Sequence, residues 1–353
     1  MSTRNANVCA MRRKSLANPI SIKDIARMAD VSHSTVSRAL SNSPLISAQT
    51  TERIHRIAEQ SQYRASEVAR SLVTRHTRTV GIVVTTIADP FAAGVVDGIE
   101  DAATEFGFSV FLANSNADPE REIRVVRSFE ERRVDGIIVT SSRAGAIYVR
   151  MIGQLRIPIV LLNNQHPSEY VQSVMIDNVE ASARATSHLI ELGHQNIAYL
   201  GDRYGEQSDT ERFSGYRHAL QAAGLCFRPE FIVLGDGKPE GGMKAMAQLL
   251  ALAERPTAVF CYNDMSALGA LRQVRVAGLQ VPGDISLTGF DDLYFSQYMQ
   301  PALTTLRQPM RQMGRMAMET LIQLLKGSAS AHSIKVAAEL VLRESTAPPK
   351  RRK

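Results

Sequence analysis

The spacing of apolar residues changes near residue 79 and divides the chain into two regions. Between residues 20 and 66, apolar residues recur every three or four positions in three short stretches, and a serine precedes each stretch. This period is typical of short amphipathic helices, for which Ser21, Ser32 and Ser47 are suitable N-caps. Beyond residue 79, short β-branched runs alternate with longer amphipathic stretches. The pattern therefore predicts an all-helical first region and an α/β second region.

Eight runs in the second region have the length and the β-branched content of buried strands. This number suits two parallel sheets covered by helices on both faces, so we expect a body of two lobes. In such folds the ligand binds at the carboxyl ends of the strands, often in the crevice between lobes. The runs are Val80–Thr85, Ser109–Ala113, Gly136–Thr140, Pro158–Leu162, Val174–Ile176, Asn196–Leu200, Ala258–Cys261 and Ser286–Phe290.

The basic residues are concentrated in the first region. Residues 1–78 contain 13 Lys or Arg and 5 Asp or Glu, whereas the remaining residues contain 28 basic and 30 acidic side chains. A basic region joined to a nearly neutral body is typical of a protein that binds a polyanion. Residues 1–19 show no periodicity and are predicted to be a disordered basic tail, and residues 347–353 form a second basic tail.

The stretch Ile22–Leu40 has the pattern of a helix-turn-helix. Ala26 is the small residue needed where the two helices touch, and Asp30 stands at the turn, where glycine is more usual. Val31 is the apolar residue that follows, and the second helix opens with polar side chains. The N-terminal end of such a helix enters the major groove of DNA and reads base edges.

Other classes of function find little support in the sequence. The cysteines Cys9, Cys226 and Cys261 have no metal-ligand spacing, so we expect no metal site, and we expect two of them to be buried. The sequence shows no nucleophile elbow, phosphate-binding loop, complete dinucleotide fingerprint or cofactor motif, so no enzyme is expected. It contains neither a membrane-spanning apolar run nor a secretory signal, so a cytoplasmic, nucleoid-associated protein is expected.

The string Val-Ser-His-Ser-Thr-Val-Ser-Arg at Val31–Arg38 resembles a strong signature of the lactose/galactose-repressor (LacI-type) family. Ser47–Arg53 and Glu67–Leu72 also resemble this family, and the similarity continues to about Ser345. The resemblance implies a helix-turn-helix domain joined to a two-lobed α/β body that is similar to periplasmic binding proteins. It also implies a homodimer that binds a double-stranded DNA operator under the control of a small molecule.

The resemblance assigns DNA contacts to residues of the first region. His33 and Ser34 occupy variable base-reading positions, and Arg38 is independently a suitable bidentate donor to guanine. The full set of expected contacts in this region is Ile22, Lys23, Ser32, His33, Ser34, Thr35, Ser37, Arg38 and Thr50.

Residues 67–78 resemble the family's hinge, a short helix that orders on DNA. In the family, two hinge helices pack together and insert a leucine into the minor groove, which bends the duplex. Leu72 matches that leucine, and Ala69 is the small residue that lets the two helices approach. Without the resemblance, a flexible linker is an equally good interpretation of this segment.

The resemblance also assigns ligand contacts, all of them beyond the ends of predicted strands or close to them. They are Phe91, Asn163, Arg212, Asn263 and Asp291, whereas the neighbouring Asp264 is expected to cap a helix. A guanidinium, a carboxylate, amides and an aromatic face suit a sugar or a sugar derivative.

One departure from the family concerns the position after Gly235-Asp236, where many relatives carry an aromatic residue and this chain has Gly237. The missing ring argues against a plain aromatic ligand. Lys238 beside it is either solvated or a contact for an acidic sugar.

The expected domains follow from these assignments. Residues 20–66 form the DNA-binding domain, and residues 79–346 form the ligand-binding and dimerisation domain. Within it, lobe 1 covers about 79–175 and 306–335, and lobe 2 covers about 176–305 and 336–346. The chain after Ser345 is too short for a tetramerising heptad helix, so a dimer is expected.

Three alternatives remain open at this point. An activator or dual regulator would share the architecture of a repressor, and the effector could either release or strengthen DNA binding. A solute-binding protein would share the body. The sequence identifies neither the effector, the operator, nor any protein co-regulator.

Overall fold

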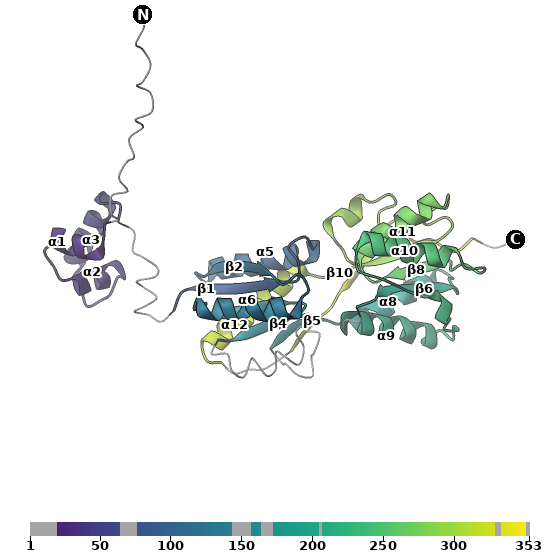
Figure 1. Ribbon diagram of the computed structural model, residues 1–353, viewed down its shortest axis with the longest axis horizontal. Coiled ribbons are helices and arrows are strands. Elements are labelled where there is room, and N and C mark those ends of the chain that lie inside the picture. Colours follow the sequence, from purple (N-terminus) through teal and green to yellow (C-terminus); the bar gives the residue numbers. More distant parts are fainter. Residues whose placement is uncertain are drawn as a thin grey trace, which may run out of the picture. The chain divides into compact units, whose positions relative to one another are not determined.

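The computed structural model describes residues 20–63, 76–142, 157–163, 172–204, 207–328 and 333–350. The chain forms two compact units, Met1–Thr77 and Arg78–Lys353, which we name the head and the body (Figure 1).

The head contains the three predicted helices, α1 (Ile22–Met28), α2 (His33–Leu40) and α3 (Ala48–Gln60). Each follows its expected serine N-cap. The Ser32 Oγ accepts from the Thr35 N–H at 3.1 Å, and the Ser47 Oγ accepts from the Thr50 N–H at 3.3 Å. Ser21 is fixed instead by the carboxylate of Asp24, which accepts from its N–H at 3.0 Å and from its hydroxyl at 2.7 Å. Side-chain capping satisfies N–H groups that short helices leave unpaired.

The turn between α1 and α2 has the predicted geometry. Asp30 adopts a left-handed conformation with φ of 49°, and the Val31 N–H then donates to the Ala26 carbonyl at 3.0 Å. Ala26 is buried between the helices, where a larger side chain would separate them. The small head core is completed by Ile25, Ala29, Val36, Ala39 and Ile54.

In its described residues, the body contains two six-stranded sheets, one for each lobe. The sheet of lobe 1 has the order β11-β5-β4-β3-β1-β2, and the sheet of lobe 2 has the order β12-β10-β9-β8-β6-β7. All pairings are parallel except that of β10 with β12. The strands of lobe 1 are β1 (Thr79–Val84), β2 (Ser109–Asn114), β3 (Gly136–Thr140), β4 (Ile159–Leu162), β5 (Ser173–Ile176) and β11 (Ile334–Val336). Those of lobe 2 are β6 (Ile197–Asp202), β7 (Ile232–Gly235), β8 (Ala258–Cys261), β9 (Ser286–Asp291), β10 (Thr304–Arg307) and β12 (Glu339–Val341).

Helices cover the sheets of both lobes (Figure 1). In lobe 1, α5 and α12 pack closely because Gly98 and Gly314 lie against backbone atoms of the opposing helix, where a Cβ would clash. The described helices of lobe 1 are α5 (Pro90–Glu105), α6 (Pro119–Glu131) and α12 (Met310–Leu325). Those of lobe 2 are α8 (Asn178–Glu191), α9 (Gln207–Ala222), α10 (Pro239–Leu250) and α11 (Asp264–Val276), with the 3₁₀ turns η1 (Pro229–Phe231) and η2 (Tyr294–Tyr298).

The chain crosses between the lobes at three places, near Asp177, Gln308 and Ala337. The predicted change from lobe 2 to lobe 1 at residue 306 is therefore early, because β10 remains in lobe 2 through Arg307. The sequence pattern also missed β7, β10, β11 and β12. These strands have three or four residues and include exposed positions, so their hydrophobic signal is short and interrupted.

Candidate DNA-reading surface and effector site

The N-terminal end of α2 presents polar side chains to solvent. Ser32, His33 and Ser34 are exposed, and Val36 and Ala39 on the opposite face are buried in the head core. The Ser32 hydroxyl lies 2.8 Å from the Ser34 hydroxyl and 2.9 Å from the Thr35 hydroxyl, so the three groups form one cluster at the start of the helix. Hydroxyls and backbone N–H groups at a helix N-terminus suit phosphate and base edges.

The other expected DNA contacts in the head differ in exposure. Lys23 and Arg38 are exposed, and Arg38 lies in the last turn of α2. Thr50 is half-buried, and its hydroxyl lies 2.8 Å from the Ser47 hydroxyl at the start of α3. Ile22 is half-buried because part of its side chain packs on the head core. Ser37 is also half-buried. Ala69 and Leu72 lie outside the described residues.

Arg212 is the central side chain of lobe 2 at the carboxyl end of its sheet. It is only 4% exposed, although it is an arginine. Its Nε donates to the Asn178 side-chain oxygen at 3.0 Å, and its Nη1 donates to the Tyr262 carbonyl at 2.6 Å. The guanidinium carbon lies 3.6 Å from the centre of the Phe290 ring. A planar cation stacked on an aromatic face and fixed by two hydrogen bonds has a defined orientation before any ligand arrives.

Arg212 lies on α9, and the first turn of this helix is fixed by the buried carboxylate of Asp209. Asp209 accepts from the Tyr199 hydroxyl at 2.7 Å and from the Asp202 N–H at 2.9 Å. Burial raises the pKa of Asp209, while these two bonds and the charge of Arg212 lower it. The contacts join α9 to the end of β6 and so hold Arg212 at the carboxyl edge of the sheet.

Asp291 lies beside Arg212 at the end of β9. The Gln308 Nε2 donates to its Oδ1 at 2.6 Å. Burial raises the pKa of Asp291 well above its usual range; the charge of Arg212 opposes this shift, and the charges of Asp264 and Asp89 add to it. A buried carboxyl group next to an oriented guanidinium offers acceptor and donor groups to the same ligand.

The roles expected for Asn263 and Asp264 need correction. Asn263, not Asp264, caps α11, because its side-chain oxygen accepts from the Ser266 N–H at 2.8 Å. Asp264 is the first residue of α11 and is fully buried. Its carboxylate accepts from the hydroxyls of Ser296 and Thr305, each at 2.5 Å, and from the Leu293 N–H at 2.8 Å. Asp264 therefore joins α11 to the loop after β9 and to β10.

The remaining expected ligand contacts lie at the edge of lobe 1. Phe91 is 8% exposed and belongs to the apolar core at the start of α5, two residues after the N-cap Asp89. Asn163 follows β4 in a left-handed conformation with φ of 50°, and its N–H donates to the Val174 carbonyl at 2.9 Å. An electrostatic interaction links Arg212 to Asp291, and Asn263 directly follows Tyr262, whose carbonyl accepts from Arg212.

Four residues at this site were not predicted from the sequence: Asn178, Tyr262, Phe290 and Gln308. Tyr262 and Phe290 precede the predicted Asn263 and Asp291, so their adjacency was available as a signal. Asn178 opens α8, and Gln308 follows β10, which the pattern did not reveal. Lys238, the possible contact for an acidic sugar, is exposed and precedes α10.

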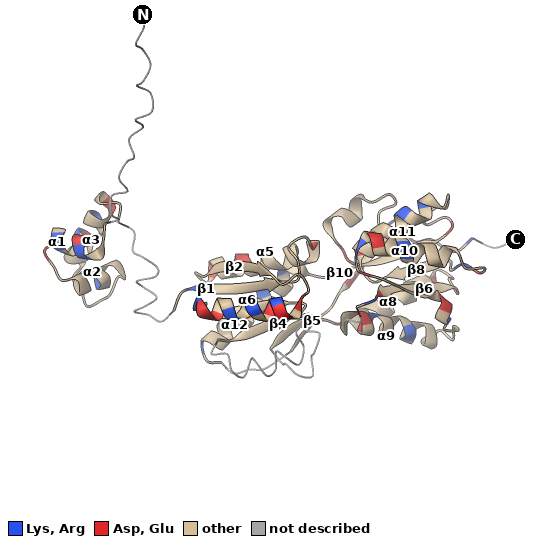
Figure 2. Ribbon diagram, in the orientation of Figure 1, with Lys and Arg blue, Asp and Glu red and all other residues tan. Residues whose placement is uncertain are grey.

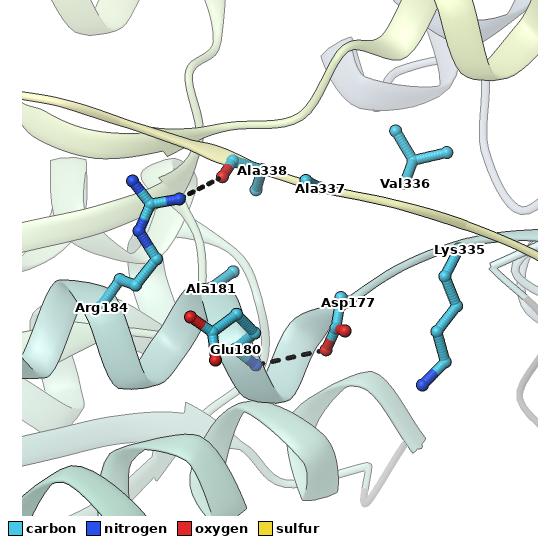
Figure 3. A pocket seen from close by; sticks show the side chains of 8 residues that line it. All are labelled: Asp177, Glu180, Ala181, Arg184, Lys335, Val336, Ala337 and Ala338. Atoms are coloured by element: carbon cyan, nitrogen blue, oxygen red, sulfur yellow. Dashed lines mark hydrogen bonds between the residues drawn. The ribbon is translucent and has the colours of Figure 1, made fainter.

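A separate hollow of about 170 Å³ lies where two crossings run side by side. Figure 3 shows Asp177, Glu180 and Arg184 of the α8 segment facing the extended segment from Lys335 to Ala338. The Arg184 Nη1 donates to the Ala338 carbonyl at 3.4 Å. The hollow is lined by both acidic and basic side chains, of which Glu180, Arg184 and Lys335 are exposed. This hollow therefore lies between two of the crossings that join the lobes.

Several general properties can be stated for the described residues. They include no cluster of three or more His, Cys, Asp or Glu that could hold a metal ion. No helix in the same ranges is both long and apolar enough to cross a bilayer.

Of the two cysteines in the described residues, Cys261 is buried and Cys226 is exposed, so the expectation that both are buried is wrong. Figure 2 shows acidic and basic residues alternating along the ribbon of α6.

Two family models match the chain. Residues 21–66 match the model of bacterial regulatory proteins of the lacI family. Residues 77–344 match the model of periplasmic binding proteins and the sugar-binding domain of the LacI family.

Individual proteins are similar over nearly the whole chain. The HTH-type transcriptional repressor PurR of Aliivibrio fischeri strain MJ11 is 35% identical over 86% of this chain and 91% of its own length. A crystal structure of the Lac repressor dimer bound to operator and the anti-inducer ONPF has a TM-score of 0.86 and 27% identity, and covers 93% of this chain and 99% of its own. The transcriptional regulator CelR in complex with cellobiose has a TM-score of 0.71 and 31% identity, over 92% and 99% of the two chains.

The fold, with its helix-turn-helix head and two-lobed α/β body, and the match of both parts to their family models agree with the resemblance found in the sequence. The chain belongs to the LacI family of bacterial regulatory proteins and is a DNA-binding transcriptional regulator.

Proposed function

We propose that the protein is a cytoplasmic repressor that binds a palindromic operator as a homodimer and responds to a sugar or a sugar derivative. The observation that carries the effector half of the proposal is the buried Arg212, stacked on Phe290 beside the buried Asp291. Adjacent hydroxyls of a sugar can accept from a guanidinium and donate to a carboxylate at once. The similar CelR structure, which contains cellobiose, supports this class of ligand. We assign the chain no catalytic activity.

The proposal divides the chain as the sequence suggested, into a head at residues 20–66, a hinge at 67–78 and an effector-binding body at 79–346. In the head, Ser32, His33, Ser34 and Arg38 contact the major groove, and Lys23, Thr35 and Thr50 contribute phosphate or base contacts. Ile22 and Ser37 complete this surface. Ala69 and Leu72 of the two hinges meet at the minor groove.

The proposed effector contacts are Phe91, Asn163, Arg212, Asn263 and Asp291. Phe91 and Asn163 belong to lobe 1, and the other three belong to lobe 2, so a ligand that touches both sets favours one relative position of the lobes. A ligand shifts such an equilibrium only by its difference in affinity for the two positions.

The DNA half of the proposal is tested by operator binding. A palindromic duplex is first selected from a random pool, and its affinity is measured by fluorescence anisotropy at a fixed salt concentration. Arg38→Ala should weaken binding by about 1–3 kcal/mol and relax the preference at one base pair. Arg124→Ala is the matched control, because Arg124 is an exposed arginine of α6 in the body. Equal affinities of the Arg38 variant and the wild type would remove Arg38 from the reading surface.

The effector half is tested by thermal shift with a panel of D-ribose, D-glucose, cellobiose, D-glucuronate and adenine. A ligand present at 100 times its dissociation constant adds about 2.7 kcal/mol of stability. Asp291→Asn should remove the response to whichever sugar raises the melting temperature, while operator binding without sugar stays unchanged. A response to adenine and to none of the sugars would contradict the proposed ligand class.

A further inference from the structure

Two consecutive aspartates at the end of β9 hold two consecutive residues of a crossing between the lobes. Asp291 accepts from the Gln308 Nε2 at 2.6 Å, and the Gln308 N–H donates to the Asp291 carbonyl at 3.2 Å. Asp292 accepts from the Arg307 Nε at 2.7 Å. Arg307 ends β10, and Gln308 precedes Pro309, the N-cap of α12 in lobe 1.

The backbone of this pair is in an unfavourable conformation. Asp291 has φ of 115° and Asp292 has φ of 57°, both in a region that L-residues other than glycine rarely adopt. Such a conformation persists only where the surroundings impose it. Because of this conformation, the two neighbouring carboxylates make separate contacts. Asp291 accepts from Gln308 on the side of Arg212, whereas Asp292 accepts from two other arginines, Arg307 and Arg343.

Asp292 has the contacts needed to impose that conformation. Its side chain is only 9% exposed and forms a second ion pair, in which its Oδ1 accepts from the Arg343 Nη2 at 2.7 Å. Arg343 is itself fixed, because its Nη1 donates to the Leu303 carbonyl at 2.9 Å and its N–H donates to the Thr304 hydroxyl at 2.9 Å. Thus Asp292 is attached to strand β10 through Arg307 and to the segment that follows β12 through Arg343.

We propose that Asp292 is a positioning residue for the effector site: its ion pairs with Arg343 and Arg307 hold the left-handed turn that places the Asp291 carboxylate beside Arg212 and against Gln308. This inference rests on the proposed function, which makes Asp291 an effector contact. It adds a physical link from that contact to lobe 1, because Gln308 begins the crossing to α12. The buried Gln308 Oε1 has no hydrogen-bond partner among the described residues, so the Asp291 carboxylate is the only described group that fixes this amide.

The test compares substitutions that separate backbone conformation from the ion pairs. Asp292→Gly permits positive φ without a carboxylate, and Asp292→Asn permits it and keeps one acceptor oxygen. Asp284→Asn is the matched control, because Asp284 is a lobe 2 aspartate that accepts from Lys350 at 2.7 Å, away from the site. Arg307→Gln removes one of the two ion pairs of Asp292 by changing a half-exposed residue. It replaces Asp292→Gly as the test variant if the Gly variant does not fold.

The first measurement needs no ligand. Hydrogen exchange of the full-length protein is followed in the peptide that contains Gln308, with the β6 peptide as an internal reference. We expect Asp292→Gly to speed exchange at Gln308 at least tenfold relative to β6, and we expect a smaller increase in Asp292→Asn and Arg307→Gln and none in Asp284→Asn. A crystal structure of the Gly variant should show the Asp291 carboxylate displaced from Gln308. Wild-type exchange and an unmoved carboxylate in that variant would overturn the proposal, since the turn would then hold without its ion pairs.

The second measurement is calorimetric titration with each sugar of the panel. Asp292→Gly should lose at least tenfold in affinity for any sugar that the wild type binds, Asp292→Asn should lose less, and Asp284→Asn should lose none. If Asp291→Asn binds such a sugar as well as the wild type does, the effector contact assigned to Asp291 is wrong, and the exchange data still decide the role of Asp292. If Asp291→Asn loses binding and Asp292→Gly keeps it, the positioning role is wrong and the effector site stands.

Discussion

Arg38 of the head and Arg212 of the body have the central recognition roles in the proposed function, and their surroundings are opposite. Arg38 is exposed on a short helix whose other face makes the core. Arg212 is 4% exposed, stacked on Phe290 and bonded to Asn178 and Tyr262. DNA is a large polyanion and can contact only side chains at the protein surface, whereas a small ligand is recognised by enclosed groups that are oriented before it binds. The same residue type therefore contributes differently to stability in the two regions.

The largest difference is expected in stability. Arg212→Met should lower the free energy of unfolding of the body by about 3–5 kcal/mol, because it leaves the buried acceptors of Asn178 and Tyr262 unpaired and removes the positive charge that acts on the buried Asp291 carboxyl. Arg217→Met on the same helix, where Arg217 is exposed and lies 5.3 Å from the Phe227 ring, should cost less than about 1 kcal/mol. Urea unfolding followed by circular dichroism measures both. Equal losses would show that burial of Arg212 does not set its contribution.

The next effect concerns an exposed apolar surface of the body. Phe111 and Leu112 are each 47% exposed on β2, one of the two edge strands of the lobe 1 sheet. An exposed apolar edge is a surface for pairing with another chain, and we infer that the second subunit covers it. Phe111→Asp should produce monomers in analytical ultracentrifugation. It should also weaken operator binding about 100-fold, because the two heads are then no longer linked.

The control for that substitution is Phe227→Asp, since Phe227 is 42% exposed in lobe 2 after α9. It should leave the dimer and the operator affinity unchanged. If the Phe111→Asp variant remained a dimer, or if the Phe227→Asp variant dissociated into monomers instead, the subunit contact would lie elsewhere.

The acid dependence of stability should differ in sign between the two regions. Burial raises the pKa of Asp264 from 3.8 to about 6, although hydrogen bonds from Ser296, Thr305 and Leu293 lower it. Between pH 4 and 6, Asp264 therefore holds a proton in the folded body and releases it in the unfolded chain. The free energy of unfolding of the body should fall by about 1–3 kcal/mol as the pH rises from 4 to 6. In the head, hydrogen bonds from Ser21 lower the pKa of Asp24, so its contribution is present above the ordinary pKa and is lost as pH falls.

This contrast is measured by urea unfolding from pH 3 to 7. Asp264→Asn should flatten the body's dependence between pH 4 and 6, and Asp24→Asn should reduce the loss of head stability in acid. A body whose stability rises steadily across pH 4 to 6 in the wild type would contradict the role of Asp264.

The smallest effect is expected at the turn of the head. Asp30 has φ of 49°, so Asp30→Gly should stabilise the head by about 0.5–1 kcal/mol by removing steric strain from an exposed position. Asn42→Gly is the matched control, with φ of 53°, and should gain less because asparagine tolerates this conformation better. Differential scanning calorimetry of the head transition measures both. A lower melting temperature for Asp30→Gly would mean that the carboxylate itself stabilises the turn.

The head was predictable from sequence because its signals are local. A serine before each helix, a small residue at Ala26 and a turn residue at Asp30 act within a few positions along the chain. The body was predictable where strands are long and buried on both faces, as β1 and β9 are. The short strands β10, β11 and β12 were not, because their pairing partners lie elsewhere in the sequence.

The effector site was only partly predictable for the same reason. The resemblance supplied Arg212 and Asp291, but the stacking on Phe290 and the bond to Gln308 depend on which strand ends meet in space. The expected cap at Asp264 was wrong because Asn263, one position earlier, already fills that role, which leaves Asp264 to bond residues 29 to 41 positions away.

The last two strands, β11 and β12, occupy opposite lobes although only Ala337 and Ala338 separate them. During synthesis, each sheet lacks one edge strand until β11 and β12 have been made. The two lobes therefore reach their complete hydrogen-bonded form within the same few steps of synthesis. A nascent chain stopped before residue 334 would expose an unpaired strand in each lobe, and quality-control proteases and aggregation would act on both lobes together.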